Sequence, residues 1–379
     1  MSSESIHPRD PDAGQARLFQ IGYILNRRGD WIWFLALPLM ALAAALGSQR
    51  WLSYVALASV NLWITIPHHF STWFRTYGIR EDWQRFKQRL VVGPLVIFAV
   101  VFAGLQVAPI TLLLVIMLWD SQHSIMQQHG FGRIYDFKAG SGSPRTPRFD
   151  LALHWILFGN MFLNAPLFVT MWLRELYRLN LLIPVSAVRF IQLASWTVTV
   201  AYLAVYLVHV VVSMRRGYPL NPIKYLFIAA SYFLWYTAAW HTASIMVFGI
   251  AHRLMHGLQY NVMVLHYVKR KSQGKANSSR FWLLRQLRAG NLLVFAVVGL
   301  LYALCFQLIT LAPLDEFGFG LIHFTDHYQA IPEHGIKAMP GWLGYHMFAE
   351  ALISTVAVVH YYFDSFIWKV RDRHVQEGL

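Results

Sequence analysis

The sequence predicts an all-α polytopic membrane protein with about ten transmembrane helices, and two observations lead to this class. Of the 379 residues, 56% are apolar and only 13% are charged, which is far from the composition of soluble domains. Apolar runs long enough to cross roughly 30 Å of hydrocarbon also recur along the chain. We expect spans at residues 31–48, 51–70, 91–105, 109–129, 150–173, 187–213, 222–240, 242–268, 290–312 and 342–367.

Short joints predict how consecutive spans are connected. Residues 47–50 separate the first two spans and residues 106–109 separate the third and fourth, so each pair is expected to form an antiparallel hairpin. The Gly-Ser-Gly-Ser-Pro stretch at 140–144 predicts a flexible turn before the fifth span. Residues 313–340, between the last two spans, form the sizeable loop expected on the outer side.

Basic residues predict the orientation, because short cytoplasmic loops of membrane proteins hold an excess of Lys and Arg. Most of the 32 basic residues fall in loops on one side of the predicted spans. The exceptions are Arg50, Arg174, Arg178, Arg189 and Lys337 on the other side and Arg253 within a span. Both termini are therefore expected in the cytoplasm, and the membrane is the inner one if the protein is bacterial.

This orientation divides the chain into three parts. We expect a cytoplasmic N-terminal segment at residues 1–30, a single transmembrane domain at 31–368 and a cytoplasmic tail at 369–379. Residues 1–30 have no apolar core, so no cleavable signal sequence is expected there.

Charge and cysteine content exclude other classes of protein. The formal charge of +14 is spread over short runs between apolar stretches, which does not suit nucleic-acid binding and suits a lipid bilayer with anionic headgroups. The single cysteine, Cys305, excludes a disulfide framework and a thiolate metal site. A metal in this protein would therefore have nitrogen and oxygen ligands.

Histidines and carboxylates gather near the ends of several predicted spans, all in the cytoplasmic leaflet under this topology. Spacings of four place His252 with His256, and His360 with Asp364, on one helix face each. Ionisable groups in hydrocarbon are costly unless they face the bundle interior, pair or bind something. The sequence therefore predicts one buried metal site toward the cytoplasmic side. Its candidate ligands are His68, His69, Asp120, His123, His129, His252, His256, His360 and Asp364.

Four further side chains are expected around the ligands. Gln127 and Gln259 could orient imidazoles, and Arg253 could neutralise a buried carboxylate or bind a carboxylate or phosphate of the substrate. His266 is the fourth, and we expect it to contact either the metal ligands or the substrate. Simpler roles exist as well: His129 could cap a helix, and His266 could lie at the membrane interface beside Lys269.

The ligand set bears on the identity of the metal. Imidazoles and carboxylates without sulfur suit iron, zinc, copper or manganese, and many ligands from several bundle helices suit a centre of two metal ions. A single zinc would use only three or four of them. We therefore predict iron, as two ions, with zinc, copper and haem as the alternatives.

This pattern resembles the histidine-rich integral-membrane non-haem di-iron enzymes, namely the fatty-acid desaturases and the alkane and lipid hydroxylases. The shared features are the cytoplasm-facing histidine clusters, the H-x3-H at His252 and His256 and the adjacent pair His68 and His69. The H-x2-H-H boxes of those families do not occur in this sequence. The resemblance implies a monooxygenase-type oxidoreductase of lipid metabolism that activates oxygen to hydroxylate, desaturate or cleave a hydrophobic small molecule.

Electrons for such a reaction would come from a cytoplasmic donor, a ferredoxin or a reductase, because the sequence has no Gly-rich dinucleotide fingerprint. Two other classes stay open. Histidines on facing helices also suit a haem-binding electron-transfer protein. Intramembrane His and Asp also mark the paths of metal or proton transporters, although here they gather on one side of the membrane.

Overall fold

The computed structural model describes residues 18–242, 244–272, 282–309 and 343–379. Within these ranges the regular structure is helical and no strand forms, which confirms the all-α class. The helices are α1 (Arg27–Asp30), η1 (Trp31–Ala36), α2 (Leu37–Trp51), α3 (Tyr54–Gly78), α4 (Arg80–Val107), α5 (Pro109–Ala139), α6 (Thr146–Asn164), α7 (Pro166–Arg178), α8 (Val185–Arg215), α9 (Pro222–His241), α10 (Ile245–Lys271), α11 (Trp282–Arg288), α12 (Leu292–Ile309), α14 (Leu343–Ile367) and α15 (Arg373–Gln376).

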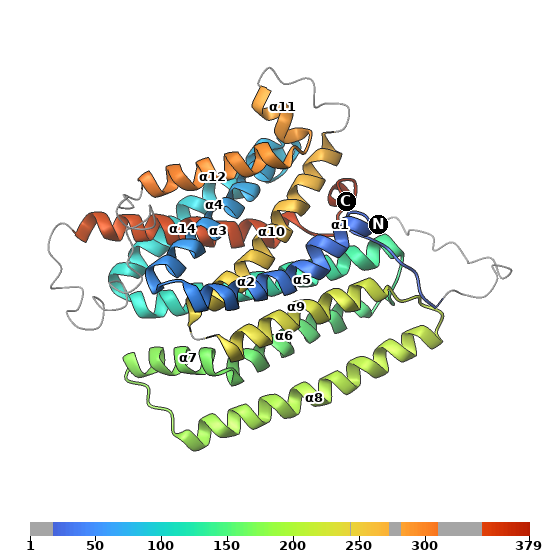
Figure 1. Cartoon of the computed structure of the whole chain (residues 1–379), viewed down its shortest axis with the longest axis horizontal. Helices are drawn as coiled ribbons and strands as arrows, with labels where there is room; N and C mark the ends of the chain where they lie inside the picture. Colours follow the sequence, from blue (N-terminus) through green and yellow to red (C-terminus); the bar gives the residue numbers. More distant parts are fainter. Residues whose placement is uncertain (1–17, 243, 273–281, 310–342) are drawn as a thin grey trace.

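The helices form a layered bundle that α10 crosses (Figure 1). Helix α10 packs against α3 and α2, whereas α14 packs against α4, α5 and α3. Helix α6 lies between α5 and α8, and α8 forms one edge of the molecule in Figure 1. The four helices α3, α5, α10 and α14 therefore meet inside the bundle, so side chains from distant parts of the sequence can share one interior site.

The fifth predicted span, residues 150–173, is two helices in the structure. Helices α6 and α7 meet at a bend of 72°. The break falls at Ala165, whose backbone is extended, and Pro166 begins α7. Proline has no N–H to continue the preceding helix and disfavours helical backbone in the residue before it.

The number of membrane spans departs from the expected ten. Among the described residues, three helices are long and apolar enough to cross a membrane: Arg27–Trp51, Arg80–Val107 and Val185–Arg215. The bent pair α6 and α7 makes up to four if it counts as one span. Helices that carry the histidine clusters, such as α3 and α10, fall short because their His, Gln, Asn and Arg side chains lower the mean hydropathy of any 18-residue window.

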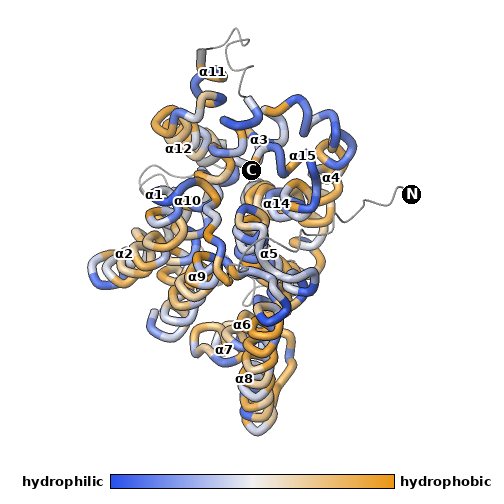
Figure 2. The backbone as a smooth tube through the Cα atoms, turned by 90° about the vertical axis from the view of Figure 1, so that its right-hand side faces the viewer, coloured by the Kyte–Doolittle hydropathy of each residue, from blue (hydrophilic) through white to orange (hydrophobic). Residues whose placement is uncertain are grey.

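The basic segments expected in the cytoplasm do gather at one end of the molecule. Hydrogen bonds join them there: Arg85 bonds Asp372, Gly142 N donates to Pro219 O and Arg270 donates to Leu379 O. Figure 2 views the molecule from this end and shows hydrophilic segments at the near ends of several helices, with hydrophobic residues along α8. Which side of a membrane this end faces stays a prediction.

Some predictions fall outside the described residues. The outer loop at 313–340, residues 1–17 of the N-terminal segment and residues 273–281 of a basic loop are among them. The division of the chain at residues 30 and 368 also stays a prediction.

Candidate metal centre

Four helices bring imidazoles and one carboxylate to a single buried point. His68 comes from α3, His123 from α5, His256 from α10 and His360 from α14. The ring centre of His123 lies 4.9 Å from that of His256 and 4.7 Å from that of His360. The ring of His68 lies 4.7 Å from that of His360. Residues almost 300 positions apart in the sequence thus share one cluster.

The ligand atoms fall into two overlapping groups among the described residues. One comprises His68, His256 and His360, and the other comprises His123, His360 and Asp364, each with its atoms within 4.8 Å of one another. His68 Nε2 and His360 Nε2 are 3.2 Å apart. Two nitrogens bound to one ion at about 2 Å each, with a tetrahedral angle between them, lie roughly 3.3 Å apart. The spacing of this pair therefore suits adjacent ligands of one ion.

Asp364 provides the negative charge closest to these rings. Its Oδ2 lies 3.7 Å from His123 Nε2 and 3.9 Å from His360 Nε2. Because Asp364 follows His360 by four residues, one turn of α14 presents both side chains to the same point. A carboxylate among neutral imidazoles is a donor set that suits a divalent cation.

Local packing sets the approach of α3 to α10. Gly257 lies beside His68, and a Cβ placed on Gly257 would be 3.4 Å from the Cβ of His68. The missing side chain allows the two helices to come close at the point where His68 and His256 face each other, with ring centres 5.3 Å apart.

Several ring nitrogens in the cluster have no hydrogen-bond partner within the described part of the chain. They are both nitrogens of His69, Nε2 of His123 and Nδ1 of His256. All three side chains are buried. A buried polar atom without a partner costs free energy, on the order of 1–3 kcal/mol each. Unsatisfied nitrogens that converge from different helices fit a site that a cation completes.

Hydroxyl groups hold two of the candidate ligands in place. Thr72 Oγ1 lies 2.6 Å from His360 Nδ1 and 2.7 Å from the Tyr260 hydroxyl, and that hydroxyl donates to Asp364 Oδ1 at 2.7 Å. The contact at Nδ1 leaves His360 Nε2 directed at the cluster. Partners of this kind fix the orientation of metal ligands.

Three of the predicted ligands lie next to the central group. The ring of His69 is 5.1 Å from that of His360, and the ring of His252 is 5.6 Å from that of His256. His252 Nε2 contacts Ser124 Oγ at 2.7 Å, so this nitrogen already has a partner. The carboxylate of Asp120 is near enough to act electrostatically on His123 and His252.

The structure places other predicted residues away from the cluster. The ring of His129 packs against His154, 5.8 Å away, because six residues of helix turn it from the face that carries His123. His266 lies near Leu379 at the far end of α10. Gln259 bonds Gln128 and the Trp33 carbonyl, so it orients no imidazole of the cluster.

Gln127 and Arg253 lie at the margin of the histidine cluster. Gln127 Nε2 donates to the backbone oxygen of His256 at 3.0 Å, so it supports α10 rather than an imidazole. Arg253 is near enough to His69, His252 and Tyr361 to act on them electrostatically.

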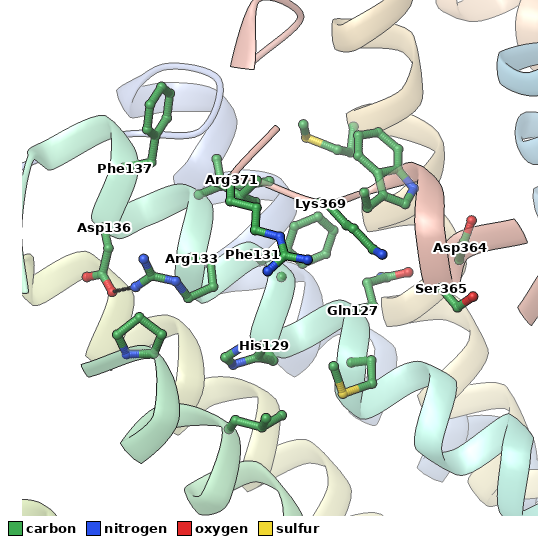
Figure 3. A pocket seen from close by; sticks show the side chains of 18 of the residues that line it. Gln127, His129, Phe131, Arg133, Asp136, Phe137, Asp364, Ser365, Lys369 and Arg371 are labelled. Atoms are coloured by element: carbon green, nitrogen blue, oxygen red, sulfur yellow. Dashed lines mark hydrogen bonds and ion pairs between the residues drawn. The ribbon is translucent and has the colours of Figure 1, made fainter. Parts of the chain in front are cut away.

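A cavity of about 1100 Å³ adjoins the cluster (Figure 3). His123, Tyr361 and Asp364 line one part of it, and Arg133, Lys369 and Arg371 line another. The lining comes from α5, α6, α10, α14 and the segment that follows α14. The cavity therefore connects the candidate ligands with the basic end of the molecule.

Sequence reasoning missed Thr72 and Ser124 as partners of the histidines, and it missed a second buried polar cluster. Lys224 of α9 is fully buried and donates to Asp136 at 2.8 Å and to Asp150 at 2.6 Å. From the sequence, Lys224 is only one more basic residue near a loop. No feature of the sequence joins it to acids on α5 and α6.

Comparison with protein-family models, with curated proteins and with solved structures found no match for this chain. The residues of the site therefore have to carry any functional argument by themselves.

Proposed function

We propose that this chain is a membrane-bound, metal-dependent oxidoreductase that acts on a lipid-soluble substrate. The observation that carries the proposal is the convergence of His68, His123, His256, His360 and Asp364 from four helices beside a large cavity. A donor set of imidazoles with a carboxylate and no thiolate suits iron. Iron held there would supply the redox chemistry by which oxygen oxidises a C–H bond, whether the outcome is hydroxylation, desaturation or cleavage.

The two groups of candidate ligands share His360, which limits how a pair of ions can be held. His360 Nε2 lies 3.2 Å from His68 Nε2 and 3.9 Å from Asp364 Oδ2, and one nitrogen can bind only one ion. A pair of ions therefore needs further ligands, and His69, His252 and Asp120 are adjacent. We propose two irons held by this wider set, in keeping with the resemblance to membrane di-iron desaturases and hydroxylases.

The side chains of the chain itself have separate tasks in this proposal. Thr72 and Tyr260 hold His360 and Asp364 in position. Apolar residues of the cavity, such as Met126 and Met263, would hold the substrate and exclude water. Electrons would arrive from a cytoplasmic ferredoxin or reductase, for which the exposed basic residues Arg80, Arg85, Lys87 and Arg89 offer a docking surface. Arg75, at the start of this basic stretch, is buried and takes no part. Anionic lipid is the other partner that suits these charges.

The membrane arrangement belongs to the same proposal. We propose that the bundle crosses an inner membrane with about ten spans, that both termini are cytoplasmic and that the metal site lies in the cytoplasmic leaflet. The gathering of the basic segments at one end of the molecule supports this orientation.

Haem binding and transport fit the geometry less well. Two nitrogens on opposite faces of a haem iron lie roughly 4 Å apart, whereas His68 Nε2 and His360 Nε2 are 3.2 Å apart and several other rings crowd the same point. A transport path should continue through the bundle. The described cavity instead joins the cluster to the basic end alone.

The proposal is tested by metal analysis of detergent-purified protein together with an absorption spectrum. We expect about two irons per chain and no Soret band. The variant His256→Ala should lose most of the iron, whereas His266→Ala, which alters the same helix outside the cluster, should retain it. Iron-loaded protein with a chemical reductant should then consume oxygen faster than His256→Ala. A Soret band, or equal metal in both variants, would contradict the proposal.

A further inference from the structure

The cavity has an uneven distribution of charge. Its acidic lining residues are already engaged: Asp364 belongs to the histidine cluster, and Asp136 is bound by Lys224 and Arg133. Lys369 and Arg371 line the cavity as well. No ion pair joins either of them to an acid within the described part of the chain.

Figure 3 shows how these two cations lie. The side chains of Lys369 and Arg371 both extend from the segment after α14 toward the middle of the cavity; in this view Arg371 lies over Phe131 and Lys369 lies on the side of Asp364. Two like charges that line one cavity without an ion-paired acid repel each other, and an anion bound beside them lowers that cost. An ammonium and a guanidinium together suit a carboxylate or a phosphate.

Much of the remaining lining of the cavity is apolar. Met126, Phe131, Ile134, Leu151 and Met263 belong to it. Its volume of about 1100 Å³ is slightly above the usual range for small-molecule sites, roughly 300–1,000 Å³. An apolar chain could occupy this part while a charged group stays at Lys369 and Arg371.

We propose that Lys369 and Arg371 form a headgroup subsite, and that the substrate is an anionic single-chain amphiphile whose tail extends toward His123 and Asp364. This inference rests on the proposed function in taking the histidine cluster as the reacting end of the cavity. The shared chemistry of the ligand is an oxyanion on a long apolar tail. A fatty acid and a lysophospholipid both supply it.

The test compares three radiolabelled probes with the same sixteen-carbon chain: palmitate, 1-palmitoyl lysophosphatidate and hexadecanol. Binding to the full chain is measured in a neutral detergent. We expect at least one anionic probe to bind at least tenfold more tightly than hexadecanol. The double variant Lys369→Gln/Arg371→Gln should abolish that preference and leave hexadecanol binding unchanged. Tighter binding of palmitate would assign the carboxylate, and tighter binding of lysophosphatidate the phosphate.

The matched control is Arg215→Gln/Arg216→Gln. These two exposed residues lie at the C-terminal end of α8 and line neither this cavity nor the one beside Lys87, so the variant removes the same charge without altering the proposed subsite. It should keep the preference for the anionic probe. Equal loss in both double variants would show general attraction by the basic surface, and equal binding of all three probes by the wild type would show no headgroup recognition. Either result overturns the proposal.

The same samples separate this inference from the metal proposal. Metal content should be equal in the wild type and in Lys369→Gln/Arg371→Gln, and the headgroup preference should persist after chelation. If the wild type holds no metal but keeps the preference, the subsite stands and the oxidoreductase proposal fails. If metal is bound without any headgroup preference, only the subsite fails.

Discussion

The bundle contains two buried polar clusters that differ in how completely their groups are paired. Around Lys224, each charge has a close partner: Asp136 also accepts from Arg133 at 2.7 Å, and Asp150 also accepts from the Tyr206 hydroxyl at 2.7 Å. In the histidine cluster, ring nitrogens of His69, His123 and His256 have no hydrogen-bond partner among the described residues, although their rings lie beside other imidazoles.

This difference separates a structural role from a binding role. A buried ion network in which each charge is neutralised holds helices together and needs nothing further. A cluster of unsatisfied nitrogens is a cost to the fold unless a ligand completes it. The Lys224 cluster should therefore depend on its own side chains, and the histidine cluster on a metal.

The largest effect is expected from breaking the ion network around Lys224. Lys224→Met leaves Asp136 and Asp150 buried with less neutralisation, and removing one partner of a buried ion pair costs about 3–5 kcal/mol. Thermal unfolding in detergent should show a large loss of stability or a failure to accumulate folded protein. Lys369→Met, at an exposed lysine, should change the stability by less than about 0.5 kcal/mol. Similar unfolding temperatures for the two variants would remove the contrast between the clusters.

The second largest effect is the stabilisation expected when metal binds to the histidine cluster. A ligand that binds only the folded state stabilises it by about 2.7 kcal/mol when its free concentration is a hundred times its dissociation constant. Ferrous iron should raise the unfolding temperature of chelator-treated wild type, and it should do so for Lys224→Arg if that variant folds. The variant His256→Ala/His360→Ala should show no rise. A rise of the same size in this variant would place the metal elsewhere.

A smaller effect is expected from removing a hydroxyl group that holds the candidate ligands in place. Tyr260→Phe removes the hydroxyl that contacts Thr72 and Asp364, which should cost about 1–2 kcal/mol and weaken metal binding about 10- to 100-fold. Competition with a chelator of known affinity measures the second quantity. The control is Tyr302→Phe, since Tyr302 bonds Trp73 away from the cluster. Unchanged metal affinity in Tyr260→Phe would mean that the hydroxyl does not position the ligands.

The smallest effect on the metal-free fold should come from an unpaired histidine. His69 has no hydrogen bond to lose within the described residues, so His69→Phe should change the stability of metal-free protein by less than about 1 kcal/mol. The unfolding temperature of chelated samples tests this. A loss as large as that of Lys224→Met would show that His69 supports the fold and would weaken the distinction between the two clusters.

The sequence predicts the helices and the helix faces better than it predicts their contacts. Spacing of four residues correctly places His360 with Asp364, and the same spacing relates Thr72 to His68 and Tyr260 to His256. That rule could have revealed both hydroxyl partners. Pro166 could likewise have revealed the break in the fifth predicted span.

Other features depend on how helices rotate against one another, which periodicity within one helix does not determine. The contacts of His129 with His154 and of Lys224 with Asp136 and Asp150 join different helices. The apolar length of a helix also says little about its surroundings when polar ligands interrupt it, as in α3 and α10. These are the points at which sequence and structure differ.

Gly257 permits the close spacing of α3 and α10 beside His68 and thereby the separation of the ligands in the proposed metal centre. An alanine there would make ordinary van der Waals contact with His68, its Cβ 3.4 Å from the Cβ of the histidine, whereas a valine would press α3 away from α10. In the proposed metal centre, ionic radius and ligand separation must match, so the size of residue 257 should affect which ion is bound. Gly, Ala and Val at position 257 should give a graded series in the preference between smaller and larger divalent cations.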